Sequence, residues 1–588
     1  MKPEWIDLGP LDDFPEAAPV LRKDPGGHRY ACVRAGASVE AIDDRCPHQG
    51  YPLSQGRVQD GVLTCAWHNW KFELATGACT FGGEPVKRYP TRIEGGRVHL
   101  DRAVDRGAEA RRIMTSLRVA LARDEMGRAL RDGIRLGELG LAAPGAPLGP
   151  LQLALEVVAR DGAERAEYGF DHGLAVLADL CSWAERGWVT PEEAFVQGAH
   201  AIAEPNLHLG RRGAARPGVG GDPRPSLGRM VEFEAADTAP VAAALSAERR
   251  DEAEARVREI VEVRGPEGAC DALLPFAAQH LYDYGHGIIF LAKGLELARR
   301  FPAAAPDLLT AVTVTLAWAT ADTALPPFAA TREAMASLAT LPLRDGGEAR
   351  LADRVAYERE VLAGERDAVK ATLAQLGAGV DPVALLRAVA HAAAARLRRF
   401  DAAWEARLDA EVSVLDVTHA VTFAESALAL TAGKPARARH AAQLAVLAAG
   451  FVGKLRHADA AEPVQGACDA QGASDAQGEL VAAARARDVT RALGLARGLG
   501  AEARREVYVA LAPFAAFDAA VRPIFYAHTV KVSEALRRLE EADPEADGAY
   551  LEALLAYLVP VRPENRARRT AAVASKFLRD GRPPEGLY

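Results

Sequence analysis

Four residues near the N-terminus have types and spacings that could hold a metal cluster. Cys46-Pro-His48 forms one pair and Cys65-Ala-Trp-His68 forms a second. Two cysteine thiolates on one iron and two neutral imidazoles on the other are the ligand set of one class of [2Fe–2S] cluster. Two cysteines and two histidines also suit tetrahedral zinc, but zinc fingers usually pair Cys with Cys and His with His at short range. Because each pair here is mixed, the spacing favours an iron–sulfur cluster.

The residues around these two pairs extend the pattern. The sequence from Cys46 to Leu100 resembles the Rieske domains of bacterial oxygenases and the Rieske ferredoxins. The positions that carry this resemblance are Pro47, Gly50, Pro52, Leu53, Trp70, Phe72 and Gly77. It implies a small β domain that binds a [2Fe–2S] cluster through the two Cys/His pairs. Asn69 stands where the family commonly has Gly, and we expect only a local effect because Asn also tolerates the left-handed backbone conformation.

The reduction potential of such a cluster depends on the hydrogen bonds that its sulfur atoms accept. Respiratory Rieske proteins carry an extra cysteine beside each ligand loop, joined as a disulfide, whereas Gln49 and Ala66 leave no such cysteines here. The hydroxyl donors of the respiratory type also lack an obvious counterpart. We therefore predict a potential at the low end of the Rieske range, about −150 mV. Such a potential suits electron delivery toward an oxygen-activating site.

The chain of 588 residues is long enough for several domains, and its character changes near residue 104. Before that point, short runs such as Gly61–Cys65 are separated by Gly and Pro, which is typical of a small antiparallel β domain. After it, Ala, Leu, Arg and Glu dominate with helical spacing, as in Val383–Arg399. We predict a multidomain protein with a small all-β Rieske domain over 1–104 and a large all-α domain over 105–588. That domain could divide into halves 105–345 and 346–588, and the low-complexity stretch 458–479 is expected to be a flexible insertion.

A histidine recurs in matched helical contexts within the second domain. The four segments are FDHGLAVLADL around His172, YGHGIIFLAKGL around His286, VTHAVTFAESAL around His419 and YAHTVKVSEAL around His528. The first two share His-Gly and a later Leu-Ala, and the last two share a Val and a Glu at the same distances after the histidine. The pattern indicates internal helical repeats with one histidine in each.

One histidine from each repeat could converge on a second metal site. The tentative ligands are His172, His286, His419 and His528, with Asp283 and Glu425 as carboxylate candidates. His419 and Glu425 would not chelate one ion together on an ideal helix, because their spacing corresponds to a rotation of about 240°. The alternative is that the histidines fill helix interfaces, each satisfied by a hydrogen bond. A haem held by two of them is a third interpretation, without the Cys-x-x-Cys-His motif of covalent attachment.

The helical domain lacks the site that Rieske oxygenases normally use. Their mononuclear iron is bound in a mixed α/β domain by an Asp-x-x-His-x-x-x-x-His pattern, which this sequence does not contain. The segments around His286 and His419 instead resemble the questin oxidase-like family of polyketide-cleaving oxygenases. That resemblance implies oxidation of an aromatic or polyketide-like substrate inside a helical domain.

Composition and charge limit the classes of partner and the cellular compartment that we expect. The net charge of −9 gives no electrostatic reason to expect nucleic acid. No basic stretch followed by an apolar run opens the chain, and the most hydrophobic later stretch is broken by Asp322, so we expect neither a signal peptide nor a membrane span. Seven cysteines without a disulfide-like framework suggest the reducing cytoplasm. No Gly-x-Gly-x-x-Gly fingerprint of a nicotinamide or flavin site is apparent, so reducing equivalents must come from another protein.

These features together predict an oxidoreductase, of the metal-dependent oxygenase type. An external reductase or ferredoxin would reduce the [2Fe–2S] cluster, and a second, non-haem iron site in the helical domain would activate dioxygen to oxidise a small organic substrate. The catalytic residues are not identified from the sequence, and a homo-oligomer is compatible with it. The alternative is an electron-transfer or docking protein whose helical domain holds no metal.

Overall fold

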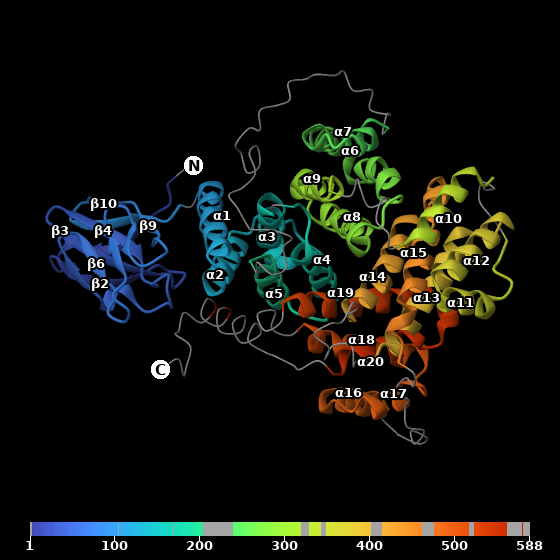
Figure 1. The fold of residues 1–588 in the computed structure, drawn as a ribbon. Coiled ribbons are helices and arrows are strands. Elements are labelled where there is room, and N and C mark those ends of the chain that lie inside the picture. The colour runs from blue at the N-terminus through green and yellow to red at the C-terminus, as the bar shows by residue number, and fades with distance from the viewer. Residues whose placement is uncertain are drawn as a thin grey trace. The chain divides into compact units, whose positions relative to one another are not determined.

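The structure is a computed structural model that describes residues 3–103, 105–166, 168–203, 239–318, 328–342, 349–401, 414–460, 476–516 and 523–560, together with Ser575 and Arg579. The chain divides into two compact units. Unit 1 includes Met1–Leu155 and unit 2 is Glu156–Ala567. Each unit is described by itself below (Figure 1).

Unit 1 begins with three small antiparallel sheets, drawn in blue in Figure 1. The sheets have the strand orders β1-β11-β10, β2-β3-β4-β9 and β5-β6-β7-β8. The strands are β1 (Trp5–Pro10), β2 (Pro19–Lys23), β3 (Arg29–Ala35), β4 (Ser38–Asp43), β5 (Arg57–Gln59), β6 (Val62–Thr64), β7 (Lys71–Glu73), β8 (Cys79–Phe81), β9 (Arg88–Tyr89), β10 (Thr91–Glu94) and β11 (Arg97–Asp101). Apolar residues alternate along the longer strands, so two cores form, one around Tyr30 and one around Leu63 and Phe72. The predicted all-β domain is thus confirmed.

A helical hairpin completes unit 1. Helix α1 (Arg106–Ala122) begins where Asp105 accepts a hydrogen bond from the Ala108 amide, a standard N-cap. Helix α2 (Met126–Glu138) follows after a short turn and packs along α1. The last strand ends at Asp101 and α1 begins at Arg106, while the compact unit extends to Leu155, so the domain boundary at 104/105 stays a prediction.

Unit 2 is helical throughout its described residues. Its α-helices are α3 (Gln152–Arg165), which begins in unit 1, α4 (His172–Glu185), α5 (Pro191–Ala203), α6 (Ala239–Ser246), α7 (Arg250–Ala277), α8 (Tyr282–Arg300), α9 (Ala305–Leu316), α10 (Ala329–Thr340), α11 (Arg354–Ala363), α12 (Glu365–Gly377), α13 (Pro382–Arg399), α14 (Val414–Thr431), α15 (Ala438–Lys454), α16 (Ala476–Ala486), α17 (Val489–Ala496), α18 (Ala501–Ala515), α19 (Pro523–Ala542) and α20 (Ala549–Leu558). Among the described residues, no helix is both long enough and apolar enough to span a membrane.

Four helices of unit 2 form its centre. Helices α4, α8, α14 and α19 contact one another in a ring, and each also packs against helices that follow or precede it, such as α5, α9, α15 and α20 (Figure 1). Helix α4 is buried on every side from His172 to Ala184, as a helix apolar all round must be. The predicted all-α fold with internal repeats is confirmed. The division into halves at 345/346 stays a prediction, and residues 461–475 of the expected insertion 458–479 lie outside the described residues.

Two glycines explain the His-Gly pairs shared by the first two repeats. A Cβ on Gly173 would lie 2.5 Å from the Ala201 carbonyl oxygen of α5. A Cβ on Gly287 would lie 3.0 Å from Leu316 of α9. Each glycine therefore lets the next helix approach closely, immediately beside the repeat histidine.

Candidate metal centres

The two ligand loops of unit 1 have the same backbone design. In the first, the Cys46 amide donates to the Tyr51 carbonyl (2.9 Å) and the Gly50 amide to the Cys46 carbonyl (2.8 Å). In the second, the Cys65 amide donates to Trp70 (2.8 Å) and the Asn69 amide to Cys65 (3.2 Å). The fifth residue of each loop is left-handed, Gly50 with φ 80° and Asn69 with φ 58°. Asn69 thus takes the conformation that the sequence analysis expected of it.

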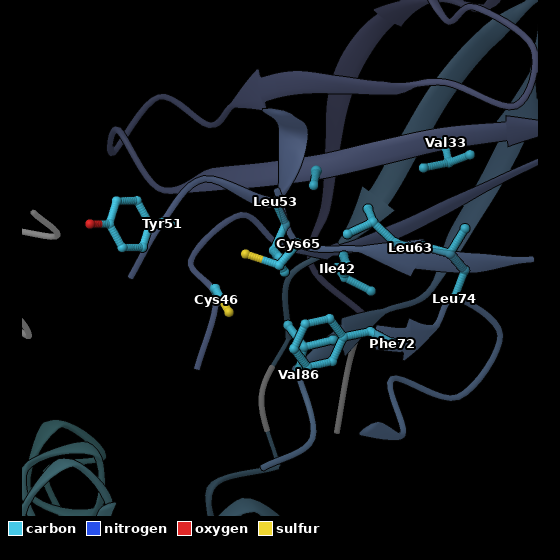
Figure 2. Close-up of a cluster of buried hydrophobic side chains, with 11 residues drawn as sticks. Val33, Ile42, Cys46, Tyr51, Leu53, Leu63, Cys65, Phe72, Leu74 and Val86 are labelled. Carbon is cyan, nitrogen blue, oxygen red and sulfur yellow. The ribbon is translucent and has the colours of Figure 1, made fainter. Parts of the chain in front are cut away.

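The four side chains of these loops converge at one edge of the β5–β8 core. Cys46 and Cys65 are buried, and a hydrogen bond joins their thiols (Figure 2). The rings of His48 and His68 lie 4.7 Å apart, centroid to centroid. The Nδ1 atom of His48 is buried without a hydrogen-bond partner in the described part of the chain. Two thiols side by side and a buried, unpartnered imidazole nitrogen fit the donor set of the predicted cluster.

The local environment favours a thiolate at Cys65 and a neutral ring at His48, whereas the hydrogen bond to Cys65 raises the pKa of Cys46 in the metal-free pair. The pKa of Cys65 falls to about 6, because the Cys46 thiol and the Trp67 and His68 amides donate hydrogen bonds to its sulfur. The pKa of His48 falls to about 4, chiefly because burial disfavours the charged ring. A thiolate and a neutral imidazole are the forms that bind iron.

Aromatic side chains surround the two ligand loops unevenly. Trp70 stacks on His48 with ring centroids 4.7 Å apart and planes 10° from parallel, and it is partly buried against the core. Trp67 is 52% exposed and stacks on Tyr51 at 4.0 Å. The Cys65 loop therefore faces solvent in this unit, whereas the His48 ring is shielded.

In unit 2, the four repeat histidines come together from the four central helices. His172 is the first residue of α4, and His286, His419 and His528 lie near the start of α8, α14 and α19. The Nε2 atom of His286 lies 3.1 Å from Nε2 of His172 and 2.9 Å from Nε2 of His419. Each of His172, His419 and His528 has a ring nitrogen within 4.8 Å of one of the others'. All four rings are buried.

These distances can be compared with metal geometry. Two nitrogens that bind one ion at about 2.1 Å and at right angles lie about 3.0 Å apart. The two Nε2–Nε2 separations, 3.1 Å and 2.9 Å, match that value. A carboxylate does not join the cluster among the described residues, so the donor set there consists of imidazoles.

A hydrogen bond fixes the tautomer of one of these histidines. The Thr418 hydroxyl donates its proton to the Leu415 carbonyl (2.6 Å) and lies 3.0 Å from Nδ1 of His528. Because that proton is already used, the hydroxyl must accept from His528, which places the ring proton on Nδ1. The Nε2 lone pair of His528 is then left for a ligand, as in metal sites where the far ring nitrogen donates to a neighbour.

Burial keeps the cluster neutral. The pKa values of His419 and His528 lie well below the ordinary value of 6.5, first because of desolvation and then because of neighbouring positive charge, including Lys531. Lys531 is buried one turn after His528, and the sequence analysis did not single it out. Lys531 lies three residues after a repeat histidine, on the same helix face. That spacing could have indicated from the sequence that the lysine lies near the histidines.

We expect the metal-free protein to lose stability in mild acid. The folded state lowers the pKa of these two histidines, so the unfolded chain binds more protons once the pH falls below about 6.5, and the loss grows until the folded-state pKa is reached. The prediction is a steeper fall of the melting temperature from pH 7.5 to 5.5 in the metal-free wild type than in its His528→Gln variant. Equal slopes in thermal melts of the two proteins would contradict it.

Glu425 and Asp283 are the two carboxylate candidates for the second metal site. Glu425 points away from the histidines, because its Oε1 lies 3.2 Å from a guanidinium nitrogen of Arg538. The side chain of Asp283 lies outside the described residues. Immediately after it, Tyr284 (φ 57°) and Gly285 (φ 84°) are left-handed, and the Tyr284 ring stacks on His419 at 5.6 Å. Backbone held in this sparsely populated region beside the four histidines is typical of functional sites.

A layer of buried charge lies further along the same four helices, which we call the charge layer. Its members are Asp179 of α4, Lys293 and Glu296 of α8, Glu425 of α14, and Glu534, Arg537 and Arg538 of α19. Lys293 donates to Asp179 at 2.7 Å, and Arg538 contacts carboxylates from α8, α14 and α19 itself. Asp179 and Lys293 follow His172 and His286 by seven residues, two helical turns on the same face. The charge layer thus joins all four histidine-bearing helices.

Comparison with known proteins concerns the N-terminal residues. The family model of the Rieske [2Fe-2S] domain matches residues 4–90. The chain is 38% identical over 100 residues to the anthranilate 1,2-dioxygenase ferredoxin subunit of Burkholderia cepacia, which covers 17% of this chain and 92% of that protein. It is 50% identical over 77 residues to the 4beta-methylsterol monooxygenase of Methylococcus capsulatus, covering 11% of this chain and 21% of that protein. Among solved structures, Sphingomonas yanoikuyae B1 ferredoxin is 25% identical, with 17% of this chain and 100% of that chain covered and a TM-score of 0.16.

Proposed function

We propose that this chain, which belongs to the Rieske [2Fe–2S] proteins through its N-terminal residues, passes electrons from its cluster to a metal site formed by the four histidines of unit 2. Dioxygen would be activated there to oxidise an organic substrate. The observation that carries the proposal is the convergence of imidazoles from four helices that are far apart in sequence, within metal-ligand distance of one another. A chain that delivers electrons needs an acceptor, and neutral imidazoles suit iron.

The residues of unit 1 have defined parts in this scheme. Cys46, His48, Cys65 and His68 would hold the cluster, which supplies one electron at a time. Trp70 covers the His48 ring and keeps water from that side. The exposed Cys65 loop, with Trp67 at its tip, is where an external reductase or ferredoxin would approach.

The residues of unit 2 would bind the second metal ion and hold its ligands in position. His172, His286, His419 and His528 would hold a redox-active iron, which when bound supplies the one-electron chemistry that dioxygen requires. Burial lowers the pKa values of His419 and His528 and so keeps these two rings neutral, and Thr418 keeps the His528 proton on Nδ1. Phe290 stacks on His286 at 4.7 Å and excludes water from that side. Zinc would fit the same nitrogens but has no redox chemistry and would leave the electrons without an acceptor.

The distances disfavour haem as the occupant. Two axial histidines must lie on opposite faces of the macrocycle, with its full plane between them. The Nε2 atoms of His286, His172 and His419 lie too close together to admit it. The aromatic or polyketide-like substrate implied by the questin oxidase-like resemblance stays a prediction.

The experiment that tests the proposed function is metal and sulfide analysis of the full-length protein. We expect two irons matched by two acid-labile sulfides, and about one further iron per chain. Reduction of the cluster under argon followed by air should reoxidise it faster when that further iron is present. Two irons, two sulfides and no other metal would favour a docking protein, and a Soret band would favour haem.

A further inference from the structure

Helix α2 presents two arginines to the β domain that holds the cluster ligands. Arg131 lies 3.0 Å from Glu84, and Arg135 lies 3.2 Å from the same carboxylate. Glu84 is 2% exposed. The side chains of Arg131 and Arg135 are 14% and 22% exposed, so salt screens these ion pairs less than it screens pairs on the open surface. The helix lies beyond residues 4–90, the extent of the Rieske match, and is an addition to that domain.

Glu84 is held close to the shielded side of the cluster site. The two residues before it are glycines that lie against Trp70, and a Cβ on Gly82 would meet the indole at 2.5 Å. Gly82 also has φ 137°, a conformation that favours glycine. Trp70 in turn stacks on His48. Glu84 and its arginines are therefore fixed relative to a ligand ring through packed groups.

Arg135 also reaches the Cys46 loop directly. Its guanidinium donates a long hydrogen bond of 3.4 Å to the Pro47 carbonyl. That carbonyl belongs to the same peptide unit as the His48 amide, which donates to the Cys46 sulfur. Hydrogen bonds in series polarise one another, so a cation on the carbonyl strengthens the amide as a donor to sulfur.

We propose that Arg135, on a helix outside the Rieske match, and its partner Glu84, inside it, are positioning residues that set the reduction potential of the cluster. Reduction adds one negative charge to the cluster, so a nearby cation and a stronger hydrogen bond to sulfur stabilise the reduced form. Arg135 supplies both effects and raises the potential. Glu84 opposes the positive charge of the two arginines and holds Arg135 in place.

The test is the midpoint potential of the cluster in the full-length protein, followed by the EPR signal of the reduced cluster during a redox titration. Arg135→Gln should shift the potential downward, since it loses the charge. Glu84→Gln should shift it upward, since Gln still accepts from the arginines but no longer offsets them. Arg135→Lys, which keeps the charge, should stay closer to wild type than Arg135→Gln. Arg123→Gln at the end of α1, which removes an exposed arginine near Glu125, is the control.

Opposite shifts of Arg135→Gln and Glu84→Gln would support the proposal, because a merely structural defect would not reverse its sign with the charge removed. Shifts no larger than that of Arg123→Gln, or shifts of both variants in one direction, would overturn it. If Arg135→Gln cannot be loaded with cluster, Glu84→Gln and Arg135→Lys decide. An upward shift in the first together with retention in the second supports the assignment, and an unchanged or lowered potential in Glu84→Gln refutes it.

Discussion

Replacing His286 and His419 together with alanine is expected to remove the iron bound in unit 2 and to leave the Rieske cluster intact. The two Nε2 atoms are 2.9 Å apart, and His286 also lies 3.1 Å from His172, so the double variant removes the central pair of the cluster. Loss of groups that only orient metal ligands already costs about 10–100-fold in affinity. Loss of two ligands should therefore exceed that range.

The measurement is iron and sulfide per chain, together with the EPR spectrum of the reduced protein. We expect the third iron to disappear while two irons, two sulfides and the cluster signal persist. His457→Ala is the matched control, because His457 is an exposed histidine of the same unit. A double variant that keeps the third iron would show that the metal lies elsewhere. A second double variant, His286→Gln with His419→Gln, keeps the side-chain volume closer to that of wild type. It shows whether loss of the third iron in the alanine variant comes from a folding defect.

Replacing Lys293 with methionine is expected to destabilise unit 2 strongly. Lys293 and Asp179 are almost completely buried and lie 2.7 Å apart. Removal of one partner of a buried ion pair leaves the other charge uncompensated and typically costs about 3–5 kcal/mol. Lys370→Met is the control, because Lys370 is an exposed lysine of α12. Urea unfolding of both variants measures the difference, and a Lys293→Met protein as stable as the control would contradict the prediction.

The cost of Lys293→Met should also depend on pH. Burial raises the pKa of Asp179 to about 7 even with Lys293 present, and loss of that cation raises it further. A carboxyl whose folded-state pKa exceeds its unfolded value contributes stability that is lost as the pH rises through the folded-state pKa. The variant should therefore lie closer to wild type at pH 6 than at pH 8.5. The double variant with Asp179→Leu should recover much of the stability and lose this pH dependence, since both members of the buried Asp179–Lys293 pair are then gone.

Local sequence patterns were enough to predict the cluster ligands, because each predicted ligand pair lies within one short loop. Cys46 with His48, and Cys65 with His68, are close enough in the chain for spacing alone to report geometry. The left-handed conformation of Asn69 was likewise predictable, since few residues tolerate it. The change from β to helical structure followed from composition and periodicity, and α1 begins two residues after the predicted boundary.

The charge layer and the α2 arginines could not be found in this way. No sequence pattern distinguishes Glu84, Arg131 and Arg135 from ordinary surface charges. Packing of α2 on the β domain buries Glu84 and partly buries the two arginines. Glu425 looked like a partner of His419 because it recurs at the same spacing as Glu534. The structure turns it toward Arg538, which lies on another helix.

By itself, the sequence determined the Rieske cluster and the existence of four repeat histidines. It did so because a ligand loop and a helical repeat are both local patterns. Their residue spacing can be recognised without knowing how the rest of the chain folds. Only the tertiary structure decided that the four histidines meet and that Glu425 does not join them. Contacts between helices separated by more than a hundred residues depend on how whole helices pack, and no spacing along the chain encodes that packing.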